Sequence, residues 1–223
     1  NRRAITKVIT SVISIDIINM HSISNRFNFL AGAYHLAYYF PRNHGNNDVI
    51  SNYILHFKDN VEPYTAKWIA LASREVPRAI KDIDMIVRVL GSSEMEASGR
   101  TSLDKLGTTL VKHTNSFYSK SSLRKLKQTR QFKKLSLAER KREVHGLYIF
   151  QKPIELLSNS PKILLIDDII TSGTTIKEIN RAIKLAIPHS MIYFFSIGKT
   201  FDSWRDVNAT NTDIELEFHK SVS

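Results

Sequence analysis

Cysteine is absent from this chain of 223 residues, which excludes a disulfide framework and a thiolate metal site. Long hydrophobic runs are missing too, because no uninterrupted apolar stretch approaches the roughly 20 residues needed to span a bilayer. The first residues also lack the apolar core of a signal peptide. Together these absences predict a soluble, cytoplasmic protein that does not associate with membranes.

Three common catalytic signatures are also missing. The eight histidines never pair at metal-ligand spacing, and no Gly-x-Ser-x-Gly elbow for a serine nucleophile occurs. Residues 198–200, Gly-Lys-Thr, look like the end of a phosphate-binding P-loop, but the position that requires the earlier glycine holds Tyr193. These absences argue against a zinc enzyme, a serine hydrolase and a P-loop nucleotide hydrolase.

Acidic residues are few relative to basic ones, 21 against 32, and the formal net charge is +11. Most of the excess lies in residues 120–142, where Glu139 is the single acidic residue. The basic residues of this block are Lys120, Arg124, Lys125, Lys127, Arg130, Lys133, Lys134, Arg140, Lys141 and Arg142. Such a block has three explanations: a nucleic-acid-binding surface, a flap that closes over a polyphosphate ligand, or an ordinary solvated face.

The strongest pattern in the chain predicts a strand, a loop and a helix across residues 161–186. Four large aliphatic residues at 163–166 indicate a parallel strand that is buried on both faces. After Thr174 the apolar residues recur at helical spacing. They are Ile176, Ile179, Ala182, Ile183 and Ala186. The loop therefore lies at the carboxyl end of a buried strand.

This loop, residues 171–175, is Thr-Ser-Gly-Thr-Thr. Its small and hydroxylated residues let backbone N–H groups converge at a helix N-terminus, where the helix dipole also favours a phosphate. Asp167 and Asp168 precede the loop and offer acceptors to sugar hydroxyls, and carboxylates beside a phosphate attract Mg²⁺. A ribose 5-phosphate satisfies both halves. The alternative is an ordinary strand-to-helix turn with solvated carboxylates.

Residues 163–175 match without departure a hydrophobic strand, two acidic residues, two hydrophobic residues and Thr-Ser-Gly-Thr-Thr. This pattern resembles the phosphoribosyl pyrophosphate (PRPP) binding motif of the type I phosphoribosyltransferases. The resemblance implies an α/β fold whose mainly parallel sheet carries helices on both faces. It also implies PRPP or ribose 5-phosphate as ligand and Mg²⁺ as cofactor, with Asp167 and Asp168 as catalytic residues that hold the metal directly or through water. The implied phosphate-binding residues are Thr171, Ser172, Gly173, Thr174 and Thr175.

The reaction implied by the resemblance is transfer of the phosphoribosyl group from C1 of PRPP to a nucleophile, with release of pyrophosphate. Charge would develop between the ribose and the departing pyrophosphate, so catalysis would be mainly electrostatic. Cations of the basic block would help to neutralise the leaving group. The acceptor and the oligomeric state are left open by the sequence.

A second predicted strand, loop and helix precedes the first. Residues 84–90 form the strand, and residues 101–112 form a helix that begins with a capping-box signature. Two such loops at the carboxyl edge of one parallel sheet would face each other across a crevice. The resemblance implies a pyrophosphate-gripping loop of Leu90, Gly91, Ser92 and Ser93. Leu90 and Ser92 depart from the family's usual polar residue and glycine, and a plain surface turn is the alternative.

The basic block resembles a narrower group, the ComF-like competence proteins. Residues 126–131 contain Thr-x-Gln, residues 135–142 contain Leu-Ser-x-x-Glu-Arg, and residues 146–148 are Gly-x-aromatic, in that group's order. Its Arg-Gly-aromatic-Asn signature and cysteine-rich zinc module are missing here. This resemblance implies DNA or RNA as partner, and a non-catalytic PRPP-binding or nucleic-acid-associated protein as the alternative function. The candidate nucleic-acid or flap residues are Lys125, Lys127, Arg130, Lys133, Lys134 and Arg140.

The remaining elements follow from the spacing of apolar residues and from turn formers. We expect helices at residues 1–25, 27–40, 49–57, 63–76 and 137–145, and strands at residues 146–150 and 191–197. The expected organisation is an N-terminal helical extension at 1–48 and a phosphoribosyltransferase-like domain at 49–223. A basic flap at about 118–148 interrupts that domain.

Overall fold

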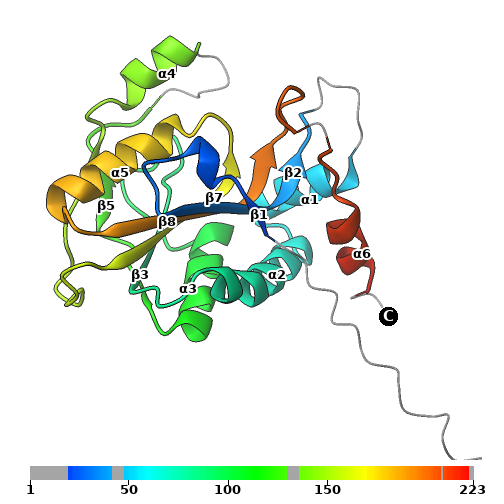
Figure 1. Ribbon diagram of the computed structural model, residues 1–223, viewed down its shortest axis with the longest axis horizontal. Helices are drawn as coiled ribbons and strands as arrows, with labels where there is room; N and C mark the ends of the chain where they lie inside the picture. The colour runs from blue at the N-terminus through cyan, green and yellow to red at the C-terminus, as the bar shows by residue number, and fades with distance from the viewer. Residues whose placement is uncertain (1–19, 42–47, 130–135, 207, 221–223) are drawn as a thin grey trace, which may run out of the picture.

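The computed structural model describes residues 20–41, 48–129, 136–206 and 208–220 of the chain (Figure 1). At its centre is a six-stranded sheet in the order β1-β2-β8-β7-β3-β4. The strands are β1 (His21–Ser22), β2 (Gly32–Tyr39), β3 (Met85–Arg88), β4 (Phe117–Tyr118), β7 (Lys162–Ile170) and β8 (Met191–Thr200). Within these described residues β1 pairs antiparallel with β2, and the other neighbours in the sheet are parallel. The predicted α/β fold with a mainly parallel sheet is therefore confirmed.

Helices cover both faces of this sheet, which was also predicted (Figure 1). One face carries α5 (Thr174–Ala186) with the hairpin of β5 (Leu123–Lys125) and β6 (Tyr148–Phe150), and α4 (Leu137–Val144) packs on α5. The other face carries α1 (Val49–Lys58), α2 (Tyr64–Ala79), α3 (Ser102–Thr114) and α6 (Thr212–Lys220). None of the helices in the described ranges combines the length and the apolar character that crossing a membrane requires.

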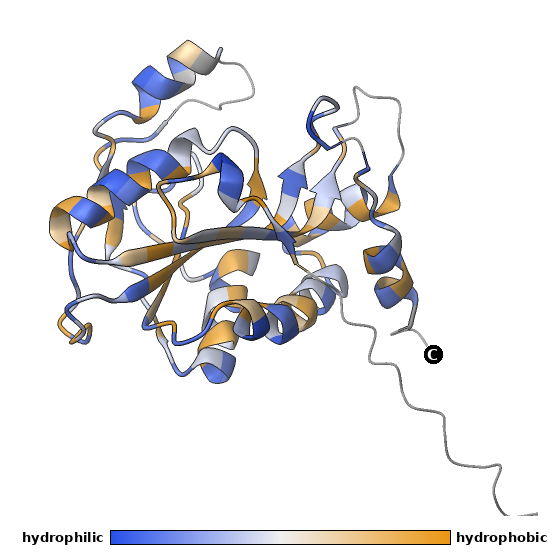
Figure 2. Ribbon diagram, viewed as in Figure 1, coloured by the Kyte–Doolittle hydropathy of each residue, from blue (hydrophilic) through white to orange (hydrophobic). Residues whose placement is uncertain are grey.

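Strand β7 shows why the sheet is buried on both sides. Ile163 and Leu165 pack in the hydrophobic cluster that includes α5, whereas Leu164 and Ile166 pack in the cluster of the opposite face, and all four are fully buried. An uninterrupted aliphatic run fits this position because successive side chains point to alternate faces. Figure 2 shows the complementary pattern on α5, where hydrophobic and hydrophilic residues alternate around the helix.

The helix starts follow their capping residues. The Asp48 side chain accepts a hydrogen bond from the Ser51 N–H (2.6 Å) and begins α1. The capping boxes predicted at residues 101–104 and 136–139 are both formed, and they begin α3 and α4. These local signals satisfy backbone N–H groups that a helix leaves without partners in its first turn.

The helix predicted at residues 27–40 is wrong, because Gly32–Tyr39 is strand β2. β2 pairs in parallel with β8, and Ala33, Leu36 and Ala37 are fully buried. A helical apolar stripe and a strand covered on both faces cannot be told apart by spacing alone. The described part of the expected N-terminal helical extension therefore contributes two strands, β1 and β2, to the sheet. The helix predicted at residues 1–25 lies mostly outside the described residues.

Candidate functional site

The carboxyl ends of β3 and β7 open on one pocket of about 720 Å³. The predicted residues that line it are Leu90, Gly91, Ser92, Ser93, Lys125, Asp167, Asp168, Thr171, Ser172, Gly173, Thr174 and Thr175. Strands β3 and β7 are neighbours, paired with Arg88 opposite Ile166. This register brings two loops that lie about 80 positions apart in the sequence to the same edge of the sheet.

The loop at residues 171–175 leads directly into α5. Gly173 has φ 71° and is the residue before the first turn of α5. A Cβ at this position would lie 2.2 Å from Cε1 of Phe27, so both the backbone conformation and the packing require glycine. The Ser172 and Thr174 hydroxyls lie 2.9 Å apart and are solvent-accessible. The loop therefore presents backbone N–H groups, hydroxyls and the positive end of a helix dipole to the pocket.

The acidic pair lies at the end of β7, immediately before this loop. Oδ1 of Asp167 accepts from the Asp168 N–H (2.9 Å), and Oδ1 of Asp168 accepts from the Ile169 N–H (2.7 Å). Oδ2 of Asp168 forms an ion pair of 2.7 Å with Nζ of Lys58, the last residue of α1. The sequence pattern gave no role to Lys58, because only the fold brings the end of α1 to the end of β7.

Two carboxylates side by side resist full ionisation. Burial, together with the charge on Asp168, raises the pKa of Asp167 well above its ordinary value. Burial would lower the pKa of Lys58, but the charge on Asp168 raises it instead, so the ammonium group stays protonated. A cation close to both carboxylates would favour the ionised form of Asp167. The electrostatics of the pair therefore suit a divalent metal ion.

The donor set agrees with Mg²⁺ bound together with a ligand. Across the described residues, no group of three or more His, Cys, Asp or Glu side chains could hold a metal ion by itself. Mg²⁺ commonly takes one or two protein carboxylates and completes its octahedron with water and phosphate oxygens. Asp167 and Asp168 fit that requirement.

A buried charge network supports the other loop, and sequence reasoning missed it. Arg88, at the end of β3, has a side chain that is only 1% exposed. Its Nε donates to Oδ1 of Asp104 (2.8 Å), and its two terminal nitrogens donate to the two carboxylate oxygens of Glu94 (2.6 and 2.7 Å). Burial opposes ionisation of Asp104, but hydrogen bonds from Tyr118 and Arg88 lower its pKa to about 2. The one sequence feature that could have indicated this network is Arg88 itself, a charged residue inside an otherwise apolar predicted strand.

Glu94 and Lys125 hold the loop at residues 91–93 from two sides. Oε2 of Glu94 accepts from the Gly91 N–H (2.7 Å), and Nζ of Lys125 donates to the Gly91 carbonyl (2.5 Å). Lys125 is 4% exposed, and burial lowers its pKa to about 8. Lys125 was expected either on a nucleic-acid-binding surface or in a flap over the ligand, and the structure places it in the pocket wall.

The other predicted cations divide into three groups. Lys127 is exposed. Arg140 lies in α4, on the outer side of α5, and its side chain is not described. Arg130, Lys133 and Lys134 lie outside the described residues. The neighbouring Arg124 forms an exposed ion pair with Glu96 (2.9 Å). Among the cations of the basic block whose side chains the structure describes, Lys125 is buried, whereas Lys120, Arg124, Lys127, Lys141 and Arg142 are exposed.

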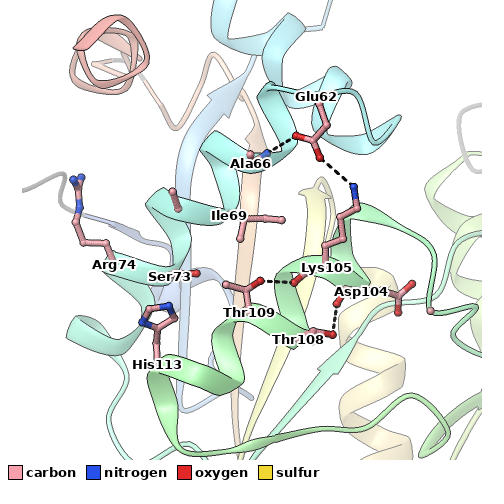
Figure 3. A pocket seen from close by; sticks show the side chains of 12 residues that line it. Glu62, Ala66, Ile69, Ser73, Arg74, Asp104, Lys105, Thr108, Thr109 and His113 are labelled. Atoms are coloured by element: carbon pink, nitrogen blue, oxygen red, sulfur yellow. Dashed lines mark hydrogen bonds and ion pairs between the residues drawn. The ribbon is translucent and has the colours of Figure 1, made fainter. Parts of the chain in front are cut away.

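A second hollow, of about 960 Å³, lies between α2 and α3 (Figure 3). Some of its polar groups are bonded to one another: Glu62 accepts from the Ala66 N–H and from Lys105, and the Thr109 hydroxyl donates to the Lys105 carbonyl. Most of its surface is apolar, and the acidic pair of β7 is not among its lining residues. The first pocket, rather than this one, places two adjacent carboxylates beside the loop at residues 171–175.

None of the family models matches the sequence, and none of the curated proteins does. Among solved structures, two crystal forms of a hypoxanthine phosphoribosyltransferase from Staphylococcus aureus are similar to this chain. The tetragonal form has 15% identity and a TM-score of 0.35, and the alignment covers 70% of this chain and 83% of the other. The orthorhombic form has 14% identity and a TM-score of 0.28, over 73% of this chain and 76% of the other.

Proposed function

We propose that this chain binds a 5-phosphoribosyl ligand, PRPP or ribose 5-phosphate, together with Mg²⁺. One observation carries the proposal: the acidic pair of β7 and the phosphate-type loop at residues 171–175 line the same pocket, two residues apart in the chain. A ligand with hydroxyls at one end and a phosphate at the other matches this order of groups. The resemblance of residues 163–175 to the PRPP motif of type I phosphoribosyltransferases points the same way.

In this proposal each part of the site has a separate task. The backbone N–H groups and hydroxyls of residues 171–175 hold the 5-phosphate. Asp167 and Asp168 accept hydrogen bonds from the ribose hydroxyls and supply carboxylate oxygens to Mg²⁺, which would neutralise phosphate charge when bound. Lys58 orients the Asp168 carboxylate through its ion pair.

The proposed reaction is phosphoribosyl transfer from PRPP. The bond between C1 and the pyrophosphate oxygen would break, a bond from C1 to an acceptor nucleophile would form, and pyrophosphate would leave. The acidic pair would stabilise positive charge on the ribose, and Lys125 would stabilise negative charge near the loop at residues 91–93. Pyrophosphate release, measured in turn with nucleobases, amines, nucleic acid and water as acceptors, tests this reaction.

The second candidate function is binding of a 5-phosphoribosyl ligand without turnover, and the contacts of Glu94 favour it. Its carboxylate already occupies the Gly91 N–H and Arg88, the groups that would otherwise face a pyrophosphate. The likeness of residues 126–148 to ComF-like proteins adds DNA or RNA as the proposed partner of such a protein. Absence of pyrophosphate release with every acceptor, combined with measurable ribose 5-phosphate binding, would favour this candidate over transfer.

Titration calorimetry with ribose 5-phosphate in the presence of Mg²⁺ tests the binding itself. Asp168→Asn should weaken binding about tenfold or more, because hydrogen bonds to a charged acceptor are lost. Asp82→Asn is the matched control: it removes one carboxylate at the opposite end of β7, where Asp82 pairs with Lys162. Equal affinity of Asp168→Asn, Asp82→Asn and the unaltered chain would refute the proposed site.

A further inference from the structure

The pocket contains a second anion-binding arrangement besides the loop at residues 171–175. The Arg88 guanidinium offers two N–H donors, the Gly91 N–H binds the same carboxylate, and the Lys125 ammonium donates to the Gly91 carbonyl. A guanidinium fork, a backbone amide and an ammonium group are the donors with which proteins hold phosphate groups. In this chain the anion that binds the Arg88 guanidinium and the Gly91 N–H is the carboxylate of Glu94.

Glu94 is not needed to neutralise Arg88. Oδ1 of Asp104 already accepts from Nε of Arg88 at 2.8 Å, and the Asp104 side chain is 2% exposed. Arg88 therefore keeps a buried counter-ion when Glu94 is absent, and its Nη1 also donates to the Val89 carbonyl (3.1 Å). Glu94 is 19% exposed and lines the pocket, so its carboxylate is at the boundary with solvent. An anion from solution could exchange with it.

The charged side chains that line the pocket indicate how loss of the Glu94 carboxylate would alter the binding of anions. Three basic side chains, Lys58, Arg88 and Lys125, and three acidic ones, Glu94, Asp167 and Asp168, line the pocket. Removing the carboxylate of Glu94 would leave the side near Gly91 with a free guanidinium edge, a free N–H and a lysine. That side would then attract a diphosphate, whereas the side near Gly173 would be unchanged.

We propose that Glu94 is an internal competitor for the diphosphate subsite, so that the pocket as it stands selects 5-phosphoribosyl ligands without a 1-diphosphate over PRPP. The preference for a 5-phosphoribosyl ligand rests on the proposed function, and it favours binding without turnover over phosphoribosyl transfer from PRPP. The presence of a masked diphosphate subsite at Arg88 and Gly91 rests on the contacts of Glu94 alone. The two parts therefore have separate tests.

The test is titration calorimetry of inorganic pyrophosphate, ribose 5-phosphate and PRPP into the unaltered chain and Glu94→Ala. Glu94→Ala should bind pyrophosphate and PRPP about ten- to a hundredfold more tightly than the unaltered chain, which is what one or two charge-assisted hydrogen bonds contribute. Its affinity for ribose 5-phosphate should be unchanged. Glu96→Ala is the matched control, because it removes the same charge two residues away at an exposed ion pair with Arg124.

Unchanged pyrophosphate affinity in folded Glu94→Ala, or an equal gain in Glu96→Ala, would overturn the inference. Glu94→Gln keeps the shape of the side chain and removes its charge, so its pyrophosphate affinity should rise by a smaller factor. This variant replaces Glu94→Ala if circular dichroism shows that Glu94→Ala does not fold. Failure of ribose 5-phosphate to bind any variant would instead refute the proposed function, and the pyrophosphate comparison would still decide the role of Glu94.

Discussion

The two loops that line the pocket differ in how they are held. The loop at residues 171–175 is shaped by its backbone, with Gly173 at positive φ before α5 and the Phe27 ring packed against it, and its Thr171 and Ser172 side chains are exposed. The loop at residues 91–93 is held by charged side chains, locally by Glu94, which also binds Arg88, and from a distant part of the chain by Lys125. One loop therefore presents an anion site to solvent, and the other fills its anion site with a side chain of the same chain.

The largest effect is expected from a substitution that removes the side-chain contacts supporting the loop at residues 91–93. Arg88→Met leaves the carboxylates of Asp104 and Glu94 without their guanidinium partner, one of them fully buried. We expect a loss of about 3–5 kcal/mol in the free energy of unfolding, measured by urea denaturation. Arg124→Met removes an arginine from an exposed pair and should cost at most about 1 kcal/mol. Similar losses in the two variants would contradict the network's role.

The next largest loss of stability is expected from a substitution in the loop at residues 171–175. Gly173→Ala combines a strained φ with a Cβ at 2.2 Å from the Phe27 ring, and it should cost about 2–5 kcal/mol. Gly146→Ala is the matched control: Gly146 has φ 66° but nothing within 4 Å of its Cβ position, so only the strain of about 1–2 kcal/mol remains. Equal losses by urea denaturation would show that the contact with Phe27 does not shape the loop.

The two sides of the pocket should also respond oppositely to pH. Because burial and Asp168 raise the pKa of Asp167, its ionised form destabilises the fold, so Asp167→Asn should be more stable than the unaltered chain at pH 7. Burial opposes ionisation of Glu94, but Arg88 and the Gly91 N–H lower its pKa, so Glu94→Gln should be less stable at pH 7. Urea denaturation at decreasing pH should show both stability differences from the unaltered chain becoming smaller. The difference for Asp167→Asn should vanish as the pH approaches 3.8, and the difference for Glu94→Gln should decline below pH 4.5. Differences of the same sign would contradict this contrast.

The smallest effect separates two lysines of the basic block. Lys125→Glu places a carboxylate against the Gly91 and Ser92 carbonyls and should destabilise the chain, whereas Lys127→Glu should stay within about 0.5 kcal/mol of it. If the block binds duplex DNA, Lys127→Glu should reduce the slope of log affinity against log salt by about 0.9. Absence of any DNA or RNA binding at low salt would remove the nucleic-acid partner.

Sequence patterns were sufficient for the elements whose information is local. The strand at Lys162–Ile170, the loop at residues 171–175 and the capping boxes of α3 and α4 all follow from residues within one turn or strand. Strand β2 could not be predicted in the same way, because its pairing with β8 lies about 160 positions away and its burial on both faces imitates a helical stripe.

The candidate site divides along the same line. Asp167, Asp168 and the loop that follows were found because they are contiguous. Lys58 was missed because its contact with Asp168 joins α1 to β7, and Arg88 and Glu94 were missed because their importance lies in contacts to Asp104 and Gly91. Charge composition alone could not separate Lys125 from the exposed lysines of the basic block, since nothing in its pattern tells which lysine the fold buries.

The most direct test of the account is the pattern of backbone amide chemical shifts in a ¹⁵N-labelled sample titrated with ribose 5-phosphate and Mg²⁺. The account predicts that the amides of residues 171–175, including Gly173, shift with saturation, while the Gly91 amide, already bonded to Glu94, stays in place. The Gly91 amide should shift only when pyrophosphate is added to Glu94→Ala. A shift centred on Gly91 with ribose 5-phosphate, or no shift at residues 171–175, would contradict the central claim.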